Sequence, residues 1–423
     1  MSAAQAPTVA NVPAATRNGL LPNMGLYLIE ERFFLAFLLG AMLLSAVLLP
    51  YSNAALWLGF MFAAYSAVAN DSIQTIGTFI ASNRGRPWWL LWAFVGGIFI
   101  VTMTIGWVVN NGDVAWGRLS GFPRPENPNY LQVIAPLFLL VLTRMRMPVS
   151  TTILLLTAFA PTSANVYGIL SKSIGGYVLA FVLAAFVWGL GGRLMRRWFT
   201  GKPAFGWVVA QWFTTSVLWS VWLIQDAANI AVFLPRQLTS TEFILFSAVV
   251  LAGLAYMLYM GGERIQEVVD EKSDVVDTRP ATIIDLVYAV VLILKTVSNT
   301  IPMSTTWVFI GLLGGRELAM SINRSGDGRS MQDAMVLMGR DITKATIGLV
   351  VSIILALSIN PWIRCEWTGF CDDLPSERQT STEGEVPALP PSSADDAATP
   401  TNGQQVSATL PTAGEVPSTQ APR

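Results

Sequence analysis

An aspartate flanked by amide side chains is the first feature of this sequence that could do chemistry. Asp71 lies between Asn70 and Gln74 at the end of an apolar run, residues 55–69, which predicts a membrane-spanning helix. Because a charged group is costly inside a membrane, an acid there indicates a functional site. Its carboxylate could bind a hard cation such as Na⁺ or accept hydrogen bonds from a protonated substrate. Gly77 is expected to break the helix and free backbone groups to face a cavity.

A matching acidic block recurs downstream. Asp226 lies between Gln225 and Asn229 and follows a second apolar run, residues 206–224. A single aspartate could merely cap a half-helix or pair with an arginine, but a structural accident is seldom duplicated.

Each acidic block is followed by a hydroxyl-rich turn of the form Pro-x-Ser-Thr-Thr. The serine of the first turn lies 79 residues after Asp71, and that of the second lies 78 residues after Asp226. Two unlike motifs repeated in the same order at nearly the same interval indicate an internal duplication. The candidate hydroxyls are Ser150, Thr151 and Thr152 in the first turn and Ser304, Thr305 and Thr306 in the second.

Two roles are open for these turns. Proline favours the first turn of a helix and serine or threonine caps it, so either turn alone is as consistent with capping as with binding. Two half-helix N-termini near mid-membrane would instead present N–H groups and hydroxyls to one small anion. Carboxylates beside an anion are sensible if phosphate arrives protonated, or if Na⁺ neutralises the site.

The composition indicates a polytopic α-helical membrane protein. Of 423 residues, 53% are hydrophobic and 13% are charged, against about 25% charged in soluble domains. The sequence has no histidine, which excludes histidine ligands, bases and proton relays, and its two cysteines are too few for a cysteine zinc site. It has no nucleotide-binding P-loop, and nothing favours nucleic acid as a partner.

The duplication organises the chain into five parts. We expect a disordered cytoplasmic arm (1–25), a lead transmembrane helix (26–53), two transporter repeats (54–203 and 204–364) and a disordered tail rich in Pro, Ser and Thr (365–423). The predicted apolar elements are 33–50 before the repeats, then 55–80, 88–109, 130–143, a short broken or re-entrant run 153–160 and 177–190, then 206–234, 243–260, 283–300, 302–318 and 347–359.

Charge placement predicts the topology. The clusters of Lys and Arg are expected on the cytoplasmic side of the membrane. With the N-terminus also in the cytoplasm, this requires each hydroxyl-rich element to cross the membrane, which gives about 11 crossings. The first repeat then crosses an odd number of times, so the second repeat is inverted relative to it. The tail then lies outside, where Cys365 and Cys371 are expected to form a small disulfide loop. Lys295, near the end of its span, is expected to extend outward in a structural role.

The paired motifs resemble those of the inorganic phosphate transporter (PiT) family, over residues 54–362. That family carries Gly-Ala-Asn-Asp-Val-Ala-Asn and Pro-Val-Ser-Thr-Thr-His in each half. This sequence departs from the pattern at Gln74 and Gln225, and it has Ile153 and Trp307 where the family has histidine.

The resemblance implies a central site between inverted repeats. Substrate contacts would come from both Ser-Thr-Thr turns together with Gln74 and Gln225. Cation coupling would fall to Asn70, Asp71, Asp226 and Asn229, with Asp71 and Asp226 as ligands of Na⁺ if coupling is to sodium.

The function expected from the sequence is secondary active transport of inorganic phosphate or a similar oxyanion across the cell membrane, by cation-coupled symport and alternating access. Sulfate or another small anion is the alternative substrate. A membrane hydrolase with an Asp71–Asp226 dyad and a non-transporting receptor or scaffold are competing classes, but no enzymatic activity is expected. The expected partners are the lipid bilayer, phosphate or sulfate, and Na⁺ or H⁺; no cofactor is expected, and a homodimer stays open.

Overall fold

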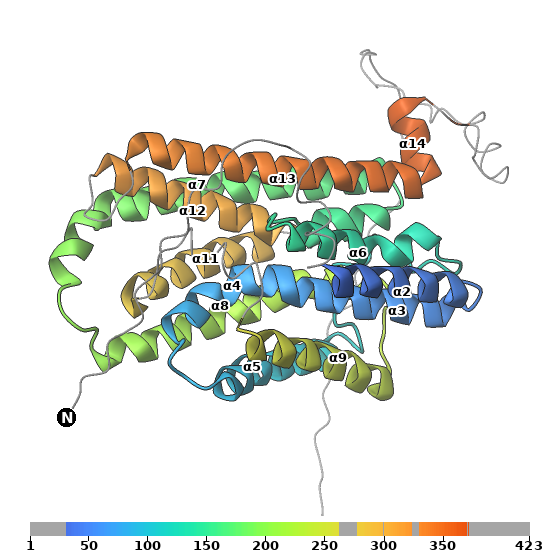
Figure 1. The fold of residues 1–423 in the computed structure, drawn as a ribbon, viewed down its shortest axis with the longest axis horizontal. Helices are drawn as coiled ribbons and strands as arrows, with labels where there is room; N and C mark the ends of the chain where they lie inside the picture. The colour runs from blue at the N-terminus through green and yellow to red at the C-terminus, as the bar shows by residue number, and fades with distance from the viewer. Residues whose placement is uncertain (1–30, 262–276, 299, 324–329, 370, 372–423) are drawn as a thin grey trace, which may run out of the picture. The chain divides into compact units, whose positions relative to one another are not determined.

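The computed structural model describes residues 31–261, 277–298, 300–323, 330–369 and 371, and within these ranges every regular element is a helix (Figure 1). The predicted arm 1–25 and the tail from residue 372 lie outside the described residues. The elements are α2 Arg32–Leu48, α3 Ser52–Ala67, η1 Val68–Ser72, α4 Ile73–Ser82, α5 Trp88–Val109, α6 Tyr130–Arg144, η2 Thr152–Leu156, α7 Ser163–Trp198, α8 Phe205–Ala231, α9 Ser240–Tyr259, α11 Thr278–Ser298, α12 Thr305–Ile322, α13 Met331–Ile359 and α14 Pro361–Thr368.

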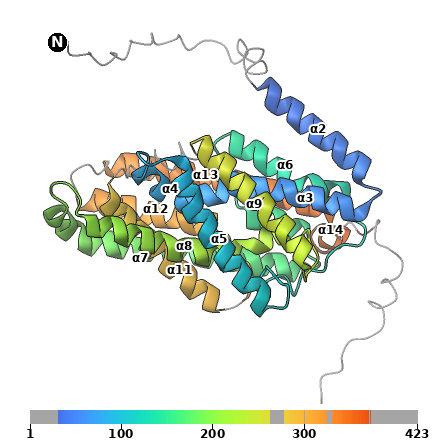
Figure 2. The ribbon, with the colours of Figure 1, turned by 90° about the horizontal axis from the view of Figure 1, so that it is seen from below.

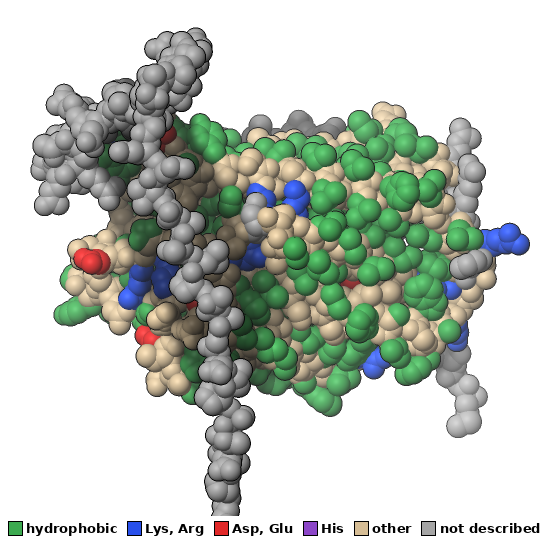
Figure 3. Space-filling model, turned by 180° about the vertical axis from the view of Figure 1, so that it is seen from behind, with side chains coloured by type: hydrophobic (Ala, Val, Ile, Leu, Met, Phe, Trp, Pro, Cys, Tyr) green, Lys and Arg blue, Asp and Glu red, His purple; other side chains and the backbone are tan. Residues whose placement is uncertain are grey.

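Seven of the described helices are long and apolar enough to cross a membrane, by length and composition. Two more apolar helices are shorter, α2 with 17 residues and α6 with 15. On the face drawn in Figure 3, hydrophobic side chains are spread over the described surface, and few acidic or basic side chains lie among them. The seven spans are Ser52–Ser82, Trp88–Val109, Ser163–Gly192, Phe205–Ala231, Ser240–Tyr259, Thr278–Ser298 and Met331–Ile359.

The predicted elements agree with the helices best where the apolar run is uninterrupted. The prediction for 88–109 coincides with α5, whereas the predicted element 177–190 is only the middle of the 36-residue α7. Polar side chains interrupt the apolar pattern near both ends of α7, but they do not interrupt its backbone hydrogen bonds. The hydropathy pattern therefore underestimated the length of this helix.

The helix that carries Asp71 is not broken at Gly77, and that expectation was wrong. Helical backbone continues from Ser52 to Ser82, and α4 runs through position 77. A break inside the bilayer would leave backbone groups without partners, whereas a continuous helix satisfies them. The irregularity is instead the π-helical turn η1, at the Asn70-Asp71 block itself. Such turns insert one extra residue into a helix and often lie at functional sites.

Two glycines allow α12 to approach α7 closely. Gly311 and Gly315 lie one turn apart on α12, and a Cβ atom at these positions would clash with the carbonyl oxygens of Tyr177 and Phe181. Small residues four apart let helix backbones come together in membranes, where burial of apolar surface gives little driving force. The pair α7 and α12 therefore spans the two predicted repeats, and α12 also packs on α13 (Figure 1).

The other helices also mix the two predicted repeats. Helix α3 of the first repeat packs on α6 of the same repeat and on α8 of the second. Helix α4 of the first repeat packs on α8 and α11 of the second. Helix α5 packs on both α8 and α9, as Figure 2 shows from below. The acidic blocks on η1 and α8 are buried by this arrangement.

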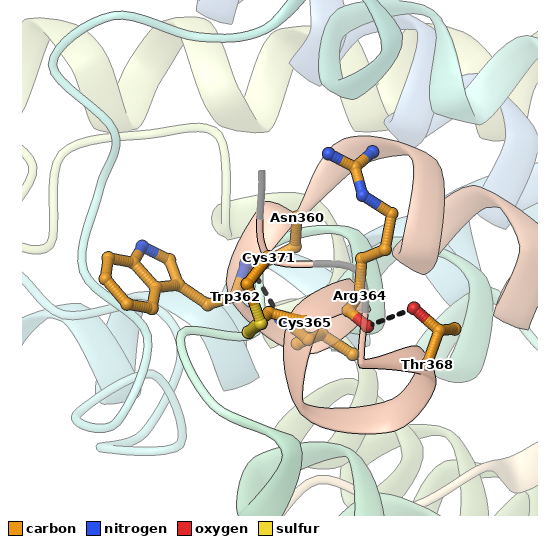
Figure 4. The surroundings of a disulfide bond; sticks show 7 residues. Asn360, Trp362, Arg364, Cys365, Thr368 and Cys371 are labelled. Carbon is orange, nitrogen blue, oxygen red and sulfur yellow. Dashed lines mark hydrogen bonds between the residues drawn. A yellow bond between two sulfur atoms is a disulfide. The ribbon is translucent and has the colours of Figure 1, made fainter. Parts of the chain in front are cut away.

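A disulfide joins Cys365, in α14, to Cys371 (Figure 4). It closes a loop of the predicted size. Helix α14 itself begins at Pro361 and is capped by Asn360, whose side-chain oxygen accepts hydrogen bonds from the Trp362 and Ile363 N–H groups.

Candidate functional site

Asp71 lies in the π-helical turn with donors from three segments around its carboxylate. Oδ1 accepts a 2.6 Å hydrogen bond from Nδ2 of Asn70 and a 3.3 Å hydrogen bond from the Thr306 hydroxyl of α12. The Thr151 hydroxyl also lies beside this carboxylate, but it makes no hydrogen bond of ordinary geometry to the described residues. Asp71 is only 2% exposed, so these contacts replace water around it.

Asp226 is held by the second hydroxyl-rich turn. The Thr305 hydroxyl donates a 2.5 Å hydrogen bond to Oδ2 of Asp226. Thr305 is fixed in turn by two aromatic residues: Nε1 of Trp222 donates to its hydroxyl at 3.3 Å, and the Tyr288 hydroxyl donates to its carbonyl at 2.9 Å. The two acids are close enough for Asp71 to be an electrostatic neighbour of Asp226.

Hydrogen bonds also cross between the two halves in both directions. The Thr306 hydroxyl, from the second half, lies 3.3 Å from Oδ1 of Asp71 and 3.2 Å from the Val149 carbonyl, both in the first half, and its one proton serves these two acceptors. In the opposite sense, Nδ2 of Asn229 donates to the Thr152 hydroxyl at 3.0 Å. Each acidic block is therefore tied to the hydroxyl-rich turn of the other half.

Both hydroxyl-rich turns lie at helix N-termini, as predicted. Ser304 is the N-cap of α12, and its Oγ accepts from the Trp307 N–H at 3.2 Å. Ser150 accepts from the Ile153 N–H at 3.0 Å, at the start of the short helical stretch 151–158. Both serines thus cap helices, which was one of the two roles open for them. An accepting hydroxyl still has its own proton to donate.

Several buried oxygens around the acids have no hydrogen-bond partner among the residues that the structure describes. Buried polar groups are nearly always paired, so a cluster of exceptions requires an explanation. The Asn229 amide lies near Asp226, but Oδ1 of Asp226 has no donor in ordinary hydrogen-bond geometry. The oxygens are Ser72 Oγ, Gln74 Oε1, Thr151 Oγ1, Gln225 Oε1, Asp226 Oδ1 and Asn229 Oδ1.

A small cavity of about 20 Å³ adjoins two of these residues. Ser72 and Asp226 lie on its wall, together with the stacked indole rings of Trp219 and Trp222. A cavity of this size has room for about one water molecule or a small ion. Its other lining residues are apolar, which leaves the polar contacts to the serine and the acid.

The two glutamines are placed differently. Nε2 of Gln74 donates to Oδ1 of Asn70 at 2.9 Å, which joins it to the Asp71 group. Both side-chain polar atoms of Gln225 are buried without a partner in the described part of the chain, so no hydrogen bond links it to the other candidates.

Asp285 is a buried acid that the sequence analysis did not single out. Its Oδ1 accepts from the Thr78 hydroxyl at 2.7 Å and its Oδ2 from the Thr215 hydroxyl at 2.5 Å. These contacts join α11 to α4 and α8, one turn before Tyr288 reaches the hydroxyl-rich turn. The signal was present, because Asp285 lies inside the predicted element 283–300, and an acid in a membrane segment is suspect by itself.

The chain matches no protein-family model, no curated protein and no solved structure. Its function is therefore inferred from the geometry of the site and from the sequence motifs.

Proposed function

We propose that this chain is a secondary transporter for inorganic phosphate or a similar oxyanion, coupled to Na⁺ or H⁺. The observation that carries the proposal is the pairing of each acidic block with the hydroxyl-rich turn of the other half, through Thr306–Asp71 and Asn229–Thr152. A site whose walls come from both halves can be opened to either side when one half moves against the other, as alternating access requires.

The unpaired oxygens favour a cation as one of the transported species. Carboxylate, amide and hydroxyl oxygens are the ligands of hard cations. Among them, Asp226 Oδ1 and Ser72 Oγ belong to residues that line the small cavity, and Asn229 Oδ1 lies in the same acidic block as Asp226. We assign Na⁺ to these oxygens. If H⁺ is the coupling ion, we assign the proton to the carboxylates of Asp71 and Asp226.

The hydroxyl-rich turns favour an anion as the other species. The first turn of α12 provides N–H groups and the positive end of the helix dipole. The Thr305 and Thr306 hydroxyls beside it donate to Asp226 and Asp71 here, and they would have to turn from the acids to bind the anion. Thr151 contributes a further hydroxyl from the first half. A tetrahedral oxyanion has four oxygens, and these donors come from two sides.

The inverted arrangement of the two repeats and about 11 crossings belong to the same proposal. They are supported by the duplicated motifs and by the placement of Lys and Arg in the sequence. The cytoplasmic N-terminus and the cell membrane as location are part of it too.

Uptake of labelled phosphate into proteoliposomes tests the function. We expect uptake that depends on an inward Na⁺ or H⁺ gradient and that unlabelled phosphate inhibits. Stronger inhibition by sulfate than by phosphate would assign the chain to sulfate. Uptake no faster than in protein-free liposomes, for both anions under both gradients, would contradict the proposal.

A further inference from the structure

Three basic side chains gather outside the acidic and hydroxyl-rich blocks. Arg118, in the 110–129 connection, and Lys172, on α7, are 4% and 8% exposed. Lys295, on α11, places its Nζ 3.3 Å from the position that a Cβ on Gly175 would occupy. Gly175 lies three residues after Lys172 on the same helix, so Lys295 approaches α7 about one turn from Lys172.

Backbone carbonyls orient two of the three cations. Arg118 donates from Nε to the Ile224 carbonyl at 2.9 Å and from Nη1 to the Thr300 carbonyl at 3.4 Å. Lys172 donates from Nζ to the Ile301 carbonyl at 2.5 Å. These contacts hold the two side chains at consecutive backbone carbonyls, those of Thr300 and Ile301.

The positive charges of the three side chains repel one another. The cationic neighbours of Lys172 are Arg118 and Lys295, so its electrostatic environment contains two like charges. Burial lowers the pKa of the Arg118 guanidinium to about 10, and the nearby Asp226 carboxylate opposes that effect. Arg118 and Lys172 are buried and Lys295 is half-buried, so an anion bound among them would lower the repulsion between the three cations.

The cluster lies directly beside the second hydroxyl-rich turn. Ser173, the residue after Lys172, accepts a 2.9 Å hydrogen bond from the Ser304 N–H. Arg118 is an electrostatic neighbour of Asp226, which Thr305 bonds. An anion held by the cations would therefore adjoin the donors at the start of α12.

We propose that Arg118, Lys172 and Lys295 form a recruitment site for a small inorganic oxyanion, distinct from the central acids and hydroxyls. The site attracts the anion by charge, and the hydroxyl-rich turn then receives it. The inference rests on the proposed transport function for the direction of that transfer, but not for the binding itself. The alternative is a structural role, in which the cations only hold the loop 300–303 against α7.

Equilibrium binding of labelled phosphate and of labelled sulfate to the purified full-length protein tests the site. We expect Lys172→Met and Lys295→Met each to weaken binding of the preferred anion by at least about 10-fold, since each removes a charged donor. Lys172→Arg keeps the charge and should retain most of the affinity. Lys344→Met, at a half-buried lysine of α13 whose Nζ donates to the Arg146 carbonyl, is the matched control and should bind as the wild type does.

A second measurement reads the local charge without any substrate. Ser298, three residues after Lys295 on α11, is exposed, and the described cysteines are already paired, so Ser298→Cys offers a single reactive thiol. A negatively charged thiol reagent should react faster there than a positively charged one. The ratio of the two rates should fall several-fold when Lys295→Met is added, and this test does not require Lys172→Met to fold.

The outcomes separate this proposal from the proposed function. Equal anion affinity in wild type, Lys172→Met and Lys295→Met, or a rate ratio that Lys295→Met does not change, overturns the recruitment site even if gradient-driven uptake is present. Lysine-dependent anion binding without any gradient-driven uptake keeps the site and removes the transport function.

Discussion

The Thr306 hydroxyl donates a 3.3 Å hydrogen bond to Oδ1 of Asp71, a residue 235 positions away in the other half of the chain. The reciprocal contact, from Asn229 to Thr152, spans 77 positions at 3.0 Å. Motifs that are separated in sequence thus share one buried location. The following predictions test what each part of that location does.

Asp71→Asn tests the charge at the centre, because it keeps the shape of the side chain and removes its negative charge. If Asp71 binds Na⁺, we expect gradient-driven uptake to be lost while anion binding persists or strengthens, since a repulsive charge has gone. If Asp71 accepts the proton of phosphate, binding itself should weaken and sulfate should compete better. Uptake and equilibrium binding measured on the same preparation separate the two. Wild-type values for both would remove Asp71 from the mechanism.

Thr305→Val and Thr151→Val remove a hydroxyl at nearly constant size. Each should weaken anion binding by about 1–3 kcal/mol if the hydroxyl contacts the substrate. Thr346→Val, at an exposed position of α13 where the hydroxyl donates to the Ile342 carbonyl, is the control. Unchanged binding in both central variants, with the control also unchanged, would mean that the anion lies elsewhere.

Gly315→Ala should destabilise the contact between α12 and α7, because the added methyl group meets the backbone of Phe181 rather than a side chain that could move. We expect a lower midpoint of thermal unfolding in detergent. Gly189→Ala, on α7 with open space around the new methyl group, should be neutral or stabilising by about 0.5–1 kcal/mol. Equal unfolding temperatures for the two variants would argue against close backbone packing at Gly315.

Asp285→Leu should lower the unfolding temperature, since it leaves the Thr78 and Thr215 hydroxyls buried without their acceptor. Adding Thr78→Val and Thr215→Val removes those hydroxyls and should recover much of the loss. Uptake by this triple variant then distinguishes two roles. Restored uptake indicates that Asp285 only joins α11 to α4 and α8, whereas a stable protein without uptake indicates a role in transport.

The predicted topology places the disulfide outside the cell. A membrane-impermeant thiol reagent applied to whole cells should label Cys365 and Cys371 only after an impermeant reductant has opened the bond. Labelling that requires cell lysis would place this end of the chain in the cytoplasm. The count of about 11 crossings from a cytoplasmic N-terminus would then be wrong by at least one.

The sequence by itself determined the features that depend on local composition. Uninterrupted apolar runs predicted helices such as α5, because in a membrane a helix is the structure that satisfies its own backbone. The order and spacing of the two acidic blocks and the two hydroxyl-rich turns marked the candidate residues, and their burial agrees with that choice.

Only the tertiary structure decided how these residues meet. Hydropathy carries no information about which helices adjoin, so the pairing of Thr306 with Asp71, the acceptors of Thr78 and Thr215, and the approach of Lys295 to α7 could not be predicted. Nor could the sequence distinguish the π-helical turn at Asp71 from a break at Gly77, since both interrupt the regular α-helical hydrogen bonding at nearly the same place. That choice depends on whether neighbouring groups can satisfy freed backbone atoms, which is a property of the packed helices rather than of any one segment.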